Sequence, residues 1–451
     1  MTTAATEATS WAELSPDERR ASRIATWLAA EGVSFQSPEA EATYRANVER
    51  LRDVIELKNV PDRVPILING TFMAADLYGV LPYDMMYDPE VLTGTTKRFL
   101  LDYKPDYFFT PAIIGSGQVF ETLDCKQAVW PGHGVPKEQG YQYIEGEYMT
   151  DEDYQQLIDD PTDFWLRGFL PRALGALEPL QRVPPFTDLW EIVLISGYMI
   201  PFGLPDVQEA LGKLMEAGRI ALDWAQHIGR FDVEAKSLGF ASSAGGLSKA
   251  PFDIVADTLR GTRSAMIDMR RRPEMLLQAV DRMTPLAVKQ GVAGATSSGN
   301  PVVFMPLHKG ADGFMSDEHF RTFYWPSLKA VCLGLIEEGC IPFLFCEGGY
   351  DSRLEYLAEL PPGTTFCLFD RTDMARAKEV LGGKVCIGGN VPASMILTGT
   401  ADDVKAYCKQ LIDTVGPGGG YVMSFGTAMD EGKPDTVHAM IDFTREYGVY
   451  R

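Results

Sequence analysis

The feature that most constrains the fold is an alternation of short apolar runs with helical patterns, which begins after residue 61 and continues to the C-terminus. The apolar runs are rich in β-branched and aromatic residues, as is typical of strands buried on both faces. The helical stretches between the later runs are amphipathic. The predicted strands are Val64–Ile68, Tyr107–Ile114, Val302–Pro306, Ile341–Cys346, Phe366–Phe369, Val385–Ile387 and Tyr421–Ser424.

Strand and helix patterns that repeat at this spacing predict an α/β fold with a parallel sheet and right-handed crossovers. Seven or eight repeats predict that the sheet closes into a (β/α)8 barrel, the TIM barrel. A doubly wound open sheet is the structural alternative.

Two regions do not follow this alternation. Residues 1–60 predict an N-terminal helical extension, in which Ser15-Pro16-Asp17-Glu18 and Ser37-Pro38 each start a helix. The barrel domain is expected over residues 61–451. Within it, the stretch from about 116 to 245 is dense in Tyr, Glu, Asp and Pro, and it predicts a large insertion over the C-terminal face of the barrel.

Charge and cysteine content exclude several classes of protein. The net charge of −21 argues against binding to nucleic acid and against docking on an anionic membrane surface. The longest apolar stretch, residues 192–204, contains Gly197 and Pro201 and is too short to span a bilayer. Seven cysteines without a CxxC pair predict reduced thiols and a cytoplasmic protein. A homo-oligomer is left open.

Polar side chains follow five consecutive predicted strands at the point where each strand ends. In a parallel barrel these ends surround one cavity, where the chemistry of such folds takes place. Asp and Asn at such positions are also common as helix caps and turn formers, so a structural role stays open for Asn390. The candidates, in chain order, are His308, Lys309, Asp312, Cys346, Glu347, Asp370, Asn390 and Thr427.

His308 and Glu347 are the strongest of these candidates. A carboxylate directly after a buried strand tends to have a raised pKa or a charged partner. His308 is interpreted as a metal ligand, a general acid–base, or a structural partner of Lys309. Cys346, with His308 and Glu347, offers a chemically reasonable zinc site, although no close Cys/His spacing supports it. His133 lies in a Gly- and Pro-rich loop beside Trp130, which is consistent with a lid over the substrate or with a rigid turn.

An ordered set of short motifs resembles the uroporphyrinogen decarboxylase superfamily, which also contains cobalamin-dependent methyltransferases. The resemblance covers about residue 61 to the end and implies a (β/α)8 barrel with a deep cleft at its C-terminal face. The motifs are Pro61-Asp62-Arg63-Val64-Pro65, Arg270-Arg271-Arg272-Pro273-Glu274, Asp312-Gly313-Phe314-Met315-Ser316 with Phe323 and Pro326, Gly389-Asn390-Val391-Pro392, Gly418-Gly419-Gly420-Tyr421-Val422, and Lys433-Pro434 with Met440.

Departures from the family pattern narrow the function. The decarboxylases carry an Arg-Gln-Ala-Gly-Arg-Tyr run near the first strand, where this chain has Asn69-Gly70-Thr71-Phe72-Met73-Ala74. Without those arginines a porphyrinogen with eight carboxylates has no cationic partner. The methyltransferases hold zinc with His-x-Cys and a later Cys, where this chain has Leu344-Phe345-Cys346 and Thr427. One zinc ligand of three is retained.

The resemblance therefore implies a corrinoid-dependent methyltransferase component. It would transfer a methyl group between a small donor (an ether, thioether or amine) and cobalamin, which is carried on a partner protein or is free, because the chain has no corrinoid-binding segment. Glu347 is predicted to be the acid, and His308 with Asp312 is predicted to position the substrate. The predicted substrate-binding residues are Asn69, His133, Lys309, Asp370, Asn390 and Thr427.

Two other functions stay open. The first is a barrel lyase or decarboxylase acting on a small carboxylic acid, for which Lys309 and Arg371 are the candidate carboxylate clamp. The second is a non-catalytic ligand-binding homologue that has lost its metal site.

Overall fold

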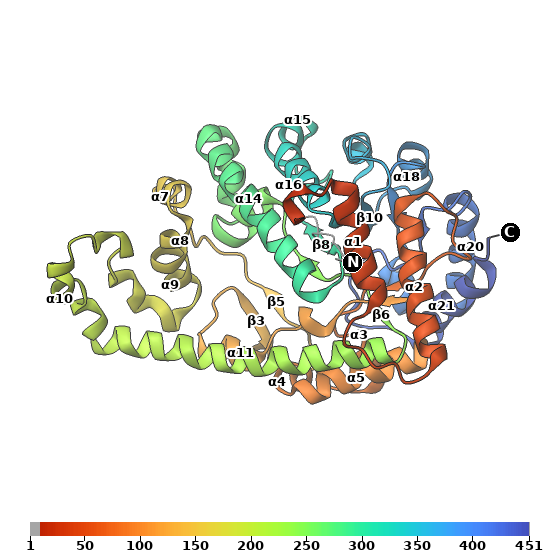
Figure 1. The fold of residues 1–451 in the computed structure, drawn as a ribbon, viewed down its shortest axis with the longest axis horizontal. Coiled ribbons are helices and arrows are strands. Elements are labelled where there is room, and N and C mark those ends of the chain that lie inside the picture. The colour runs from red at the N-terminus through yellow and green to blue at the C-terminus, as the bar shows by residue number, and fades with distance from the viewer. Residues whose placement is uncertain (1–9, 451) are drawn as a thin grey trace, which may run out of the picture.

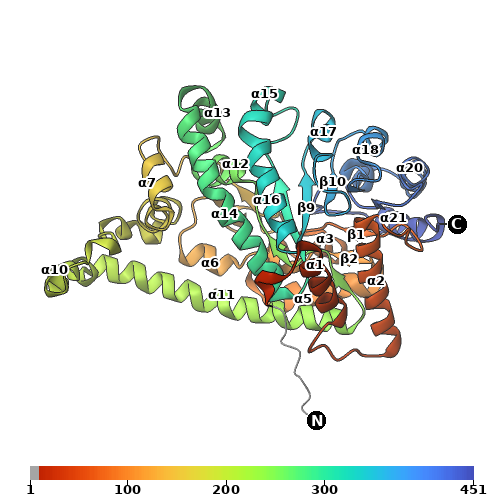
Figure 2. The ribbon, with the colours of Figure 1, turned by 45° about the horizontal axis from the view of Figure 1, so that its top comes forward.

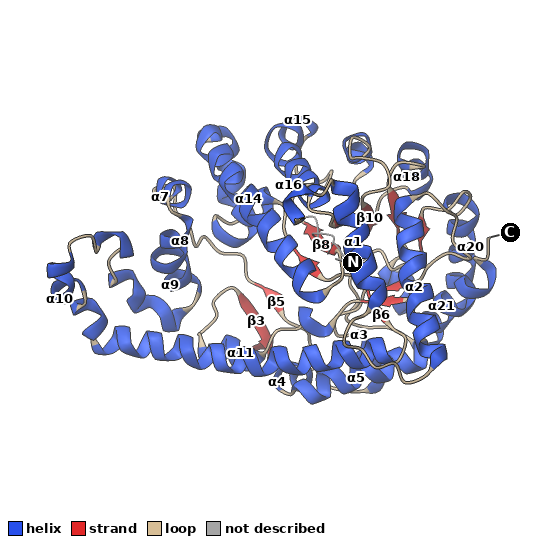
Figure 3. Ribbon diagram, viewed as in Figure 1, coloured by secondary structure: helices blue, strands red, loops and turns tan. Residues whose placement is uncertain are grey.

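The computed structural model describes residues 10–450, and it contains a closed barrel of parallel strands surrounded by helices (Figures 1 and 3). β1 and β12 join the two ends of the sheet, since Ile66 bridges Met423 in parallel and the N–H of Leu67 donates to Met423 O at 2.9 Å. The barrel strands are β1 (Leu67–Ile68), β2 (Tyr107–Phe108), β6 (Ala241–Ser242), β7 (Gly246–Leu247), β8 (Val302–Leu307), β9 (Ile341–Cys346), β10 (Phe366–Phe369), β11 (Cys386–Gly388) and β12 (Tyr421–Val422).

β6 and β7 are two pieces of one interrupted strand. β6 pairs with β2, whereas β7 pairs with β8. Between them the N–H of Gly245 donates to Val302 O at 2.9 Å. The sequence pattern did not predict this strand, because Gly and Ser replace the β-branched residues that mark the others.

Helices cover the outside of the barrel, in the order that the alternating pattern predicted (Figure 2). The predicted helix of residues 316–338 is found in three consecutive segments, of which α16 is the longest. The principal outer helices are α3 (Met73–Tyr78), α4 (Pro82–Tyr87), α5 (Pro89–Tyr103), α13 (Thr262–Arg271), α14 (Pro273–Ser298), α16 (Trp325–Glu337), α17 (Leu354–Leu357), α18 (Met374–Leu381), α19 (Ala393–Thr398), α20 (Ala401–Val415) and α21 (Pro434–Tyr447).

The N-terminal helices close the end of the barrel opposite to the strands' carboxyl ends. Ser15 caps α1 (Pro16–Ala29) through the predicted capping box, and Ser37 caps α2 (Pro38–Glu56). The apolar stripe of α2, which includes Val48 and Leu51, belongs to the same buried cluster as the interior side chains of the strands. Within the barrel, Phe304 packs against Phe109 and Phe343 with ring centroids 4.8 Å and 5.2 Å away.

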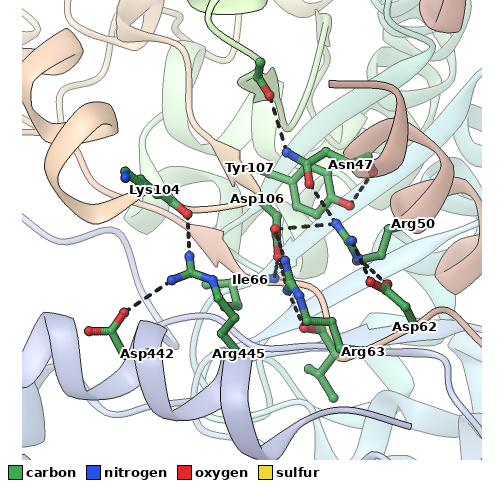
Figure 4. A network of polar contacts seen from close by, with 12 residues as sticks. Asn47, Arg50, Asp62, Arg63, Ile66, Lys104, Asp106, Tyr107, Asp442 and Arg445 are labelled. Atoms are coloured by element: carbon green, nitrogen blue, oxygen red, sulfur yellow. Dashed lines mark hydrogen bonds and ion pairs between the residues drawn. The ribbon is translucent and has the colours of Figure 1, made fainter. Parts of the chain in front are cut away.

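A buried ion-pair network joins α2 to the amino ends of β1 and β2 (Figure 4). Asp106, which is 4% exposed, accepts from both terminal nitrogens of Arg63 at 2.6 Å and 2.5 Å and from the N–H of Ile66 at 2.9 Å. Arg50 of α2 lies 3.5 Å from the same carboxylate and also pairs with Asp62 at 2.6 Å. Tyr107 OH donates to the backbone oxygen of Asn47 at 2.6 Å.

Residues 109–240 separate β2 from β6 and form the predicted insertion. Part of it borders the C-terminal mouth: Gly140 packs against Phe72 and Asp430, in the loops after β1 and β12, and Glu145 lies 3.9 Å from Lys309. The later part of the insertion extends sideways from the barrel (Figures 1 and 2). Its elements are α6 (Gly117–Thr122), β3 (Ala128–Pro131), β4 (Gly134–Val135), β5 (Gln142–Tyr143), α7 (Tyr154–Asp159), α8 (Pro161–Asp163), α9 (Leu170–Ala173), α10 (Ile195–Tyr198) and α11 (Pro205–Ser237).

Some predicted strands are shorter in the structure. The predicted strand Tyr107–Ile114 ends at Phe108, because Pro111 begins a 3₁₀ turn that the Thr110 hydroxyl caps. The predicted strand Tyr421–Ser424 ends at Val422. Within residues 10–450 we find no helix that is long and apolar enough to cross a membrane.

Candidate active site at the barrel mouth

The loop after β8 is held by a buried carboxylate. Asp253, at the end of α12 (Pro251–Asp253), accepts from the backbone N–H of His308 at 2.9 Å and of Lys309 at 3.1 Å. The hydroxyl of Tyr324 donates to the same carboxylate at 2.8 Å. Burial, together with the neighbouring Asp257 carboxylate, raises the pKa of Asp253. Asp253 therefore fixes the backbone from which the His308 side chain projects.

A second carboxylate, Asp257, orients the imidazole of His308. The distance from Asp257 Oδ2 to His308 Nδ1 is 2.5 Å, and the ammonium groups of Lys249 and Lys309 lie 2.9 Å and 3.1 Å from the same carboxylate. Burial opposes ionisation of Asp257, but the His308 hydrogen bond and the Lys249 charge outweigh it and hold its pKa well below the usual range. Burial likewise opposes protonation of His308, but the Asp257 contact outweighs it and raises the pKa of His308.

Glu347, the first residue after β9, faces the other ring nitrogen of this histidine. Its Oε1 lies 3.8 Å from His308 Nε2, and its side chain is 43% exposed at the mouth. Burial raises the pKa of Glu347, the nearby carboxylates Asp253 and Asp257 add to this, and His308 opposes it. Asp257, His308 and Glu347 therefore form a continuous line from a fixed carboxylate to a carboxyl group that solvent or a ligand reaches.

Asp370 and Asn390 follow the next two strands, and Asp370 lies beside Glu347. Asp370 follows β10 and accepts from the N–H of Gly348 at 3.1 Å, while burial raises its pKa. Asn390 follows β11, is 6% exposed, and donates to Thr372 O at 2.9 Å. Thr427 lies in the loop after β12, directly after Gly426, whose backbone packs against Asp370. His308 and Glu347 therefore face each other directly, and Thr427 lies on the loop next to Asp370. Both amide groups of Asn390 are bonded within the fold, since Tyr407 OH donates to Asn390 Oδ1 at 3.1 Å.

The structure does not assemble the zinc ligands that the sequence allowed. Cys346 is fully buried in the cluster between the strands and the outer helices, whereas Phe345 faces the barrel interior. Because side chains alternate along a strand, Cys346 points away from the side on which Glu347 lies. No group of three or more His, Cys, Asp or Glu side chains suited to a metal ion occurs among residues 10–450. The side chains at the mouth therefore do not fit the zinc site of the family.

Asp312 is separated from His308 and organises a neighbouring loop. Its carboxylate accepts from the Ser352 hydroxyl at 2.7 Å and lies 3.4 Å from Nε of the buried Arg353. These contacts indicate that Asp312 holds the loop between β8 and α16 in place. Among the described residues, Asp312 makes no hydrogen bond or ion pair with His308. The predicted partnership of the two is not supported by this geometry.

Asn69 and His133 lie on different elements: Asn69 is in the barrel and His133 is in the insertion. Asn69 directly follows β1 and is 2% exposed, and its Nδ2 has no hydrogen-bond partner among residues 10–450. His133 lies in the turn between β3 and β4, stacks on Trp130 at 4.8 Å between ring centroids, and lies 3.8 Å from Glu121. The stacking supports a rigid turn at His133.

Sequence reasoning missed Asp253, Asp257 and Lys249. All three lie just after the interrupted strand β6–β7, which the sequence pattern did not predict. A usable signal was present, because Pro251 marks the first turn of a helix and the two aspartates follow four residues apart, on one helical face.

A parallel α/β barrel with an imidazole and several carboxylates at the carboxyl ends of its strands has the architecture of a TIM-barrel enzyme. Residues 234–447 match the family model described as uroporphyrinogen decarboxylase (URO-D). The solved structure of a methyltransferase from Methanosarcina mazei has a similar fold, with a TM-score of 0.57 and 16% identity over 90% of this chain and 98% of that one.

Two curated relatives are uroporphyrinogen decarboxylases. That of Aromatoleum aromaticum is 28% identical over 47% of this chain, which spans 61% of the relative's length. That of Flavobacterium johnsoniae is 24% identical over 64% of this chain and 89% of the relative. The family match over residues 234–447 and these relatives confirm that the chain is similar to the uroporphyrinogen decarboxylase family, as its motifs predicted.

Proposed function

We propose that the chain is a methyltransferase component that moves a methyl group between a small methylated donor and cobalamin carried on a partner protein. The observation that carries this proposal is the Asp257–His308–Glu347 line, in which a carboxyl group with a raised pKa stands at the open barrel mouth. Such a group supplies a proton to a leaving oxygen, nitrogen or sulfur. The methyltransferase with a similar barrel supports the assignment of the reaction class.

The proposed chemistry needs one proton from this chain. When the bond between the methyl carbon and the donor heteroatom breaks, the bonding electron pair stays on the heteroatom, and the carboxyl of Glu347 protonates it. The corrinoid supplies the nucleophile that takes the methyl carbon. His308 Nε2 faces Glu347 and is placed to return a proton to it, while Asp257 keeps the ring in one orientation.

The polar groups near the mouth suit a small neutral or cationic donor. Asn69, directly after β1, has a buried Nδ2 without a hydrogen-bond partner among the described residues, and we assign it to an oxygen of the donor. Lys309, Asp370, Asn390 and Thr427 lie on the loops after β8, β10, β11 and β12. Phe109 and Phe304, which pack edge to face within the barrel, provide apolar surface below these groups.

The charges argue against the decarboxylase alternative. A substrate carboxylate needs a cation that is free to turn toward it, but Lys249 and Lys309 both contact the Asp257 carboxylate, and Lys309 also lies 3.9 Å from Glu145. Arg371 is 83% exposed and lies 3.6 Å from Asp370. The mouth therefore offers no preorganised clamp for several carboxylates among the residues that we describe.

The test is a spectroscopic assay of cob(I)alamin methylation with methyl ethers, thioethers and methylamines as donors. We expect protein-dependent loss of cob(I)alamin absorbance with one donor class. Release of carbon dioxide from a small carboxylic acid, without methylation, would establish the lyase instead. Binding of donor or cobalamin with no turnover would establish the non-catalytic alternative.

Replacement of Asp257 by Asn is expected to lower the pKa of His308, because the hydrogen-bonding carboxylate that raises it is removed. The measurement is the NMR titration of the His308 ring in the wild type and the variant, with His308→Gln to assign the signal. Asp442→Asn is the matched control, since Asp442 lies 3.6 Å from the exposed His438 on α21. An unchanged His308 titration in Asp257→Asn would exclude the orienting role.

The same contact predicts the sign of a pH effect on stability. Folding raises the pKa of His308, so its contribution to stability is complete below about pH 6.5, the ordinary histidine pKa, and is lost as the pH rises through the raised value. Folding lowers the pKa of Asp257, so its contribution is present above about pH 3.9 and is lost as the pH falls.

A further inference from the structure

The insertion ends in an exposed apolar surface far from the barrel mouth. We call it the apolar tip and define it as the large side chains of residues 186–200. Trp190 is 91% exposed, Val193 78% and Ile192 73%. The remaining members are Phe186, Leu194, Ile195, Met199 and Ile200, which are between 41% and 68% exposed.

The apolar tip lies at the far end of α11, the longest helix of the chain (Figures 1 and 2). A helix of 33 residues is about 50 Å long, so the tip stands well away from the barrel. Met215 and Leu222 on α11 are 69% and 61% exposed, and they extend the apolar surface along the helix.

The tip is supported by packing and hydrogen bonds within the insertion. A small core of Leu177, Leu180, Val183 and Val207 lies beneath it. Tyr198 OH donates to Pro185 O at 3.0 Å, and the Tyr198 and Phe186 rings both pack against Phe202. Its apolar side chains are therefore presented outward by a fixed support.

Exposed apolar surface of this extent on a protein marks an interaction site. Phe, Tyr and Trp side chains bury about 150–250 Å² each, so the tip together with Met215 and Leu222 offers an area comparable to the roughly 800 Å² per partner of a standard interface. Asp188 and Glu191 are the two charged residues among residues 186–200, so an occupant is recognised mainly by apolar contact.

The area and composition of the tip favour a second copy of the chain as that occupant, because an apolar surface of this extent is complementary to itself in a two-fold contact. Two chains with a net charge of −21 repel each other wherever their bodies approach. Charges farther apart than about 8 Å are largely screened at physiological salt, so contact through tips that carry only Asp188 and Glu191, at the ends of long helices, avoids most of this repulsion. An anionic membrane is disfavoured as the occupant, because the basic residues beside the tip are already paired with acidic residues. Arg182 pairs with Asp206, and Lys213 pairs with Glu216.

We propose that two copies of the chain form a two-fold symmetric dimer through the apolar tip. In such an isologous contact residues 186–200 of one copy pack against the same residues and the exposed face of α11 of the other. The two barrel mouths stay open, because the contact lies at the opposite end of α11.

The test is sedimentation velocity of the full chain over a wide range of concentration. We expect a wild-type dimer, and we expect Val193→Asp to weaken dimerisation by at least about a hundredfold, because it places a charge at the centre of an apolar contact. Val233→Asp is the matched control: Val233 lies on α11 near the barrel, is 46% exposed, and is expected to leave the dimer intact. Added salt is expected to strengthen the wild-type dimer by screening the repulsion.

Three results would overturn the proposal. The first is a wild-type protein that stays monomeric at every concentration. If this monomer also floats with phosphatidylcholine vesicles, then the tip binds membranes instead. The second is a dimer that Val193→Asp leaves unchanged. The third is a dimer that Val193→Asp and Val233→Asp weaken equally. Met215→Asp repeats the test from α11 if the Val193 variant does not fold, which circular dichroism would reveal.

Discussion

Replacement of Glu347 by Gln is expected to reduce methyl transfer by at least about a hundredfold and to leave the fold intact. Gln has the shape of Glu but no proton to give to the leaving heteroatom. Burial disfavours the charged form of Glu347, which is why its pKa is raised, so the neutral amide adds no cost of its own. Turnover in the cob(I)alamin assay and the thermal unfolding midpoint are the two measurements.

The matched control is Glu337→Gln at the other end of the barrel. Glu337 is the last residue of α16 and is exposed beside the amino end of β9, so its substitution is expected to change neither turnover nor stability. Retained turnover in Glu347→Gln would remove the assignment of Glu347 as the acid. Lost turnover together with a collapsed unfolding midpoint would show that the effect is structural.

The pH profile provides an independent test of the same assignment. A general acid acts in its protonated form, so the wild-type rate is expected to fall as the pH rises through the raised pKa of Glu347. Glu347→Gln should lack this decline, and its residual rate should be flat over that range. An identical decline in both proteins would assign the titrating group elsewhere.

The sequence predicted the barrel because its later strands are buried on both faces and therefore carry unbroken apolar runs. Ile341–Cys346 and Phe366–Phe369 were predicted with the observed bounds for this reason. The capping boxes at Ser15 and Thr400 are local hydrogen bonds between residues three apart, and local sequence determines them.

Contacts between distant segments could not be predicted in this way. Asp257 and His308 are 51 positions apart, and the strand that brings them together is rich in Gly and Ser. Whether Cys346 or Glu347 faces the cavity depends on the register of β9, which shifts every side chain to the other face when it changes by one residue. The sideways course of the insertion depends on the length and direction of α11, which no short motif encodes.

Substitution of Asp106 by Asn is expected to lower the free energy of unfolding by about 3–5 kcal/mol, which is the largest effect on stability that we predict. The Asp106 carboxylate is buried between Arg63 and Arg50, and it also accepts from the N–H of Ile66 (Figure 4). An amide carries no charge to balance the two guanidinium groups, which stay in place at 9% and 14% exposure. Urea unfolding of the wild type and the variant measures the difference.

Asp442→Asn is the control for the same chemistry at the surface. Asp442 pairs with Arg445 at 3.3 Å on α21, and both side chains are well exposed, so the expected loss is about 0–1 kcal/mol. The contrast between the two variants isolates burial as the cause, since each removes the negative charge from an Asp–Arg pair. If Asp106→Asn costs no more than Asp442→Asn, then the apolar stripe of α2 holds the N-terminal helices on the barrel without the network. Equal slopes of the two unfolding curves are required for this comparison, because a changed slope would indicate that α1 and α2 detach in a separate step.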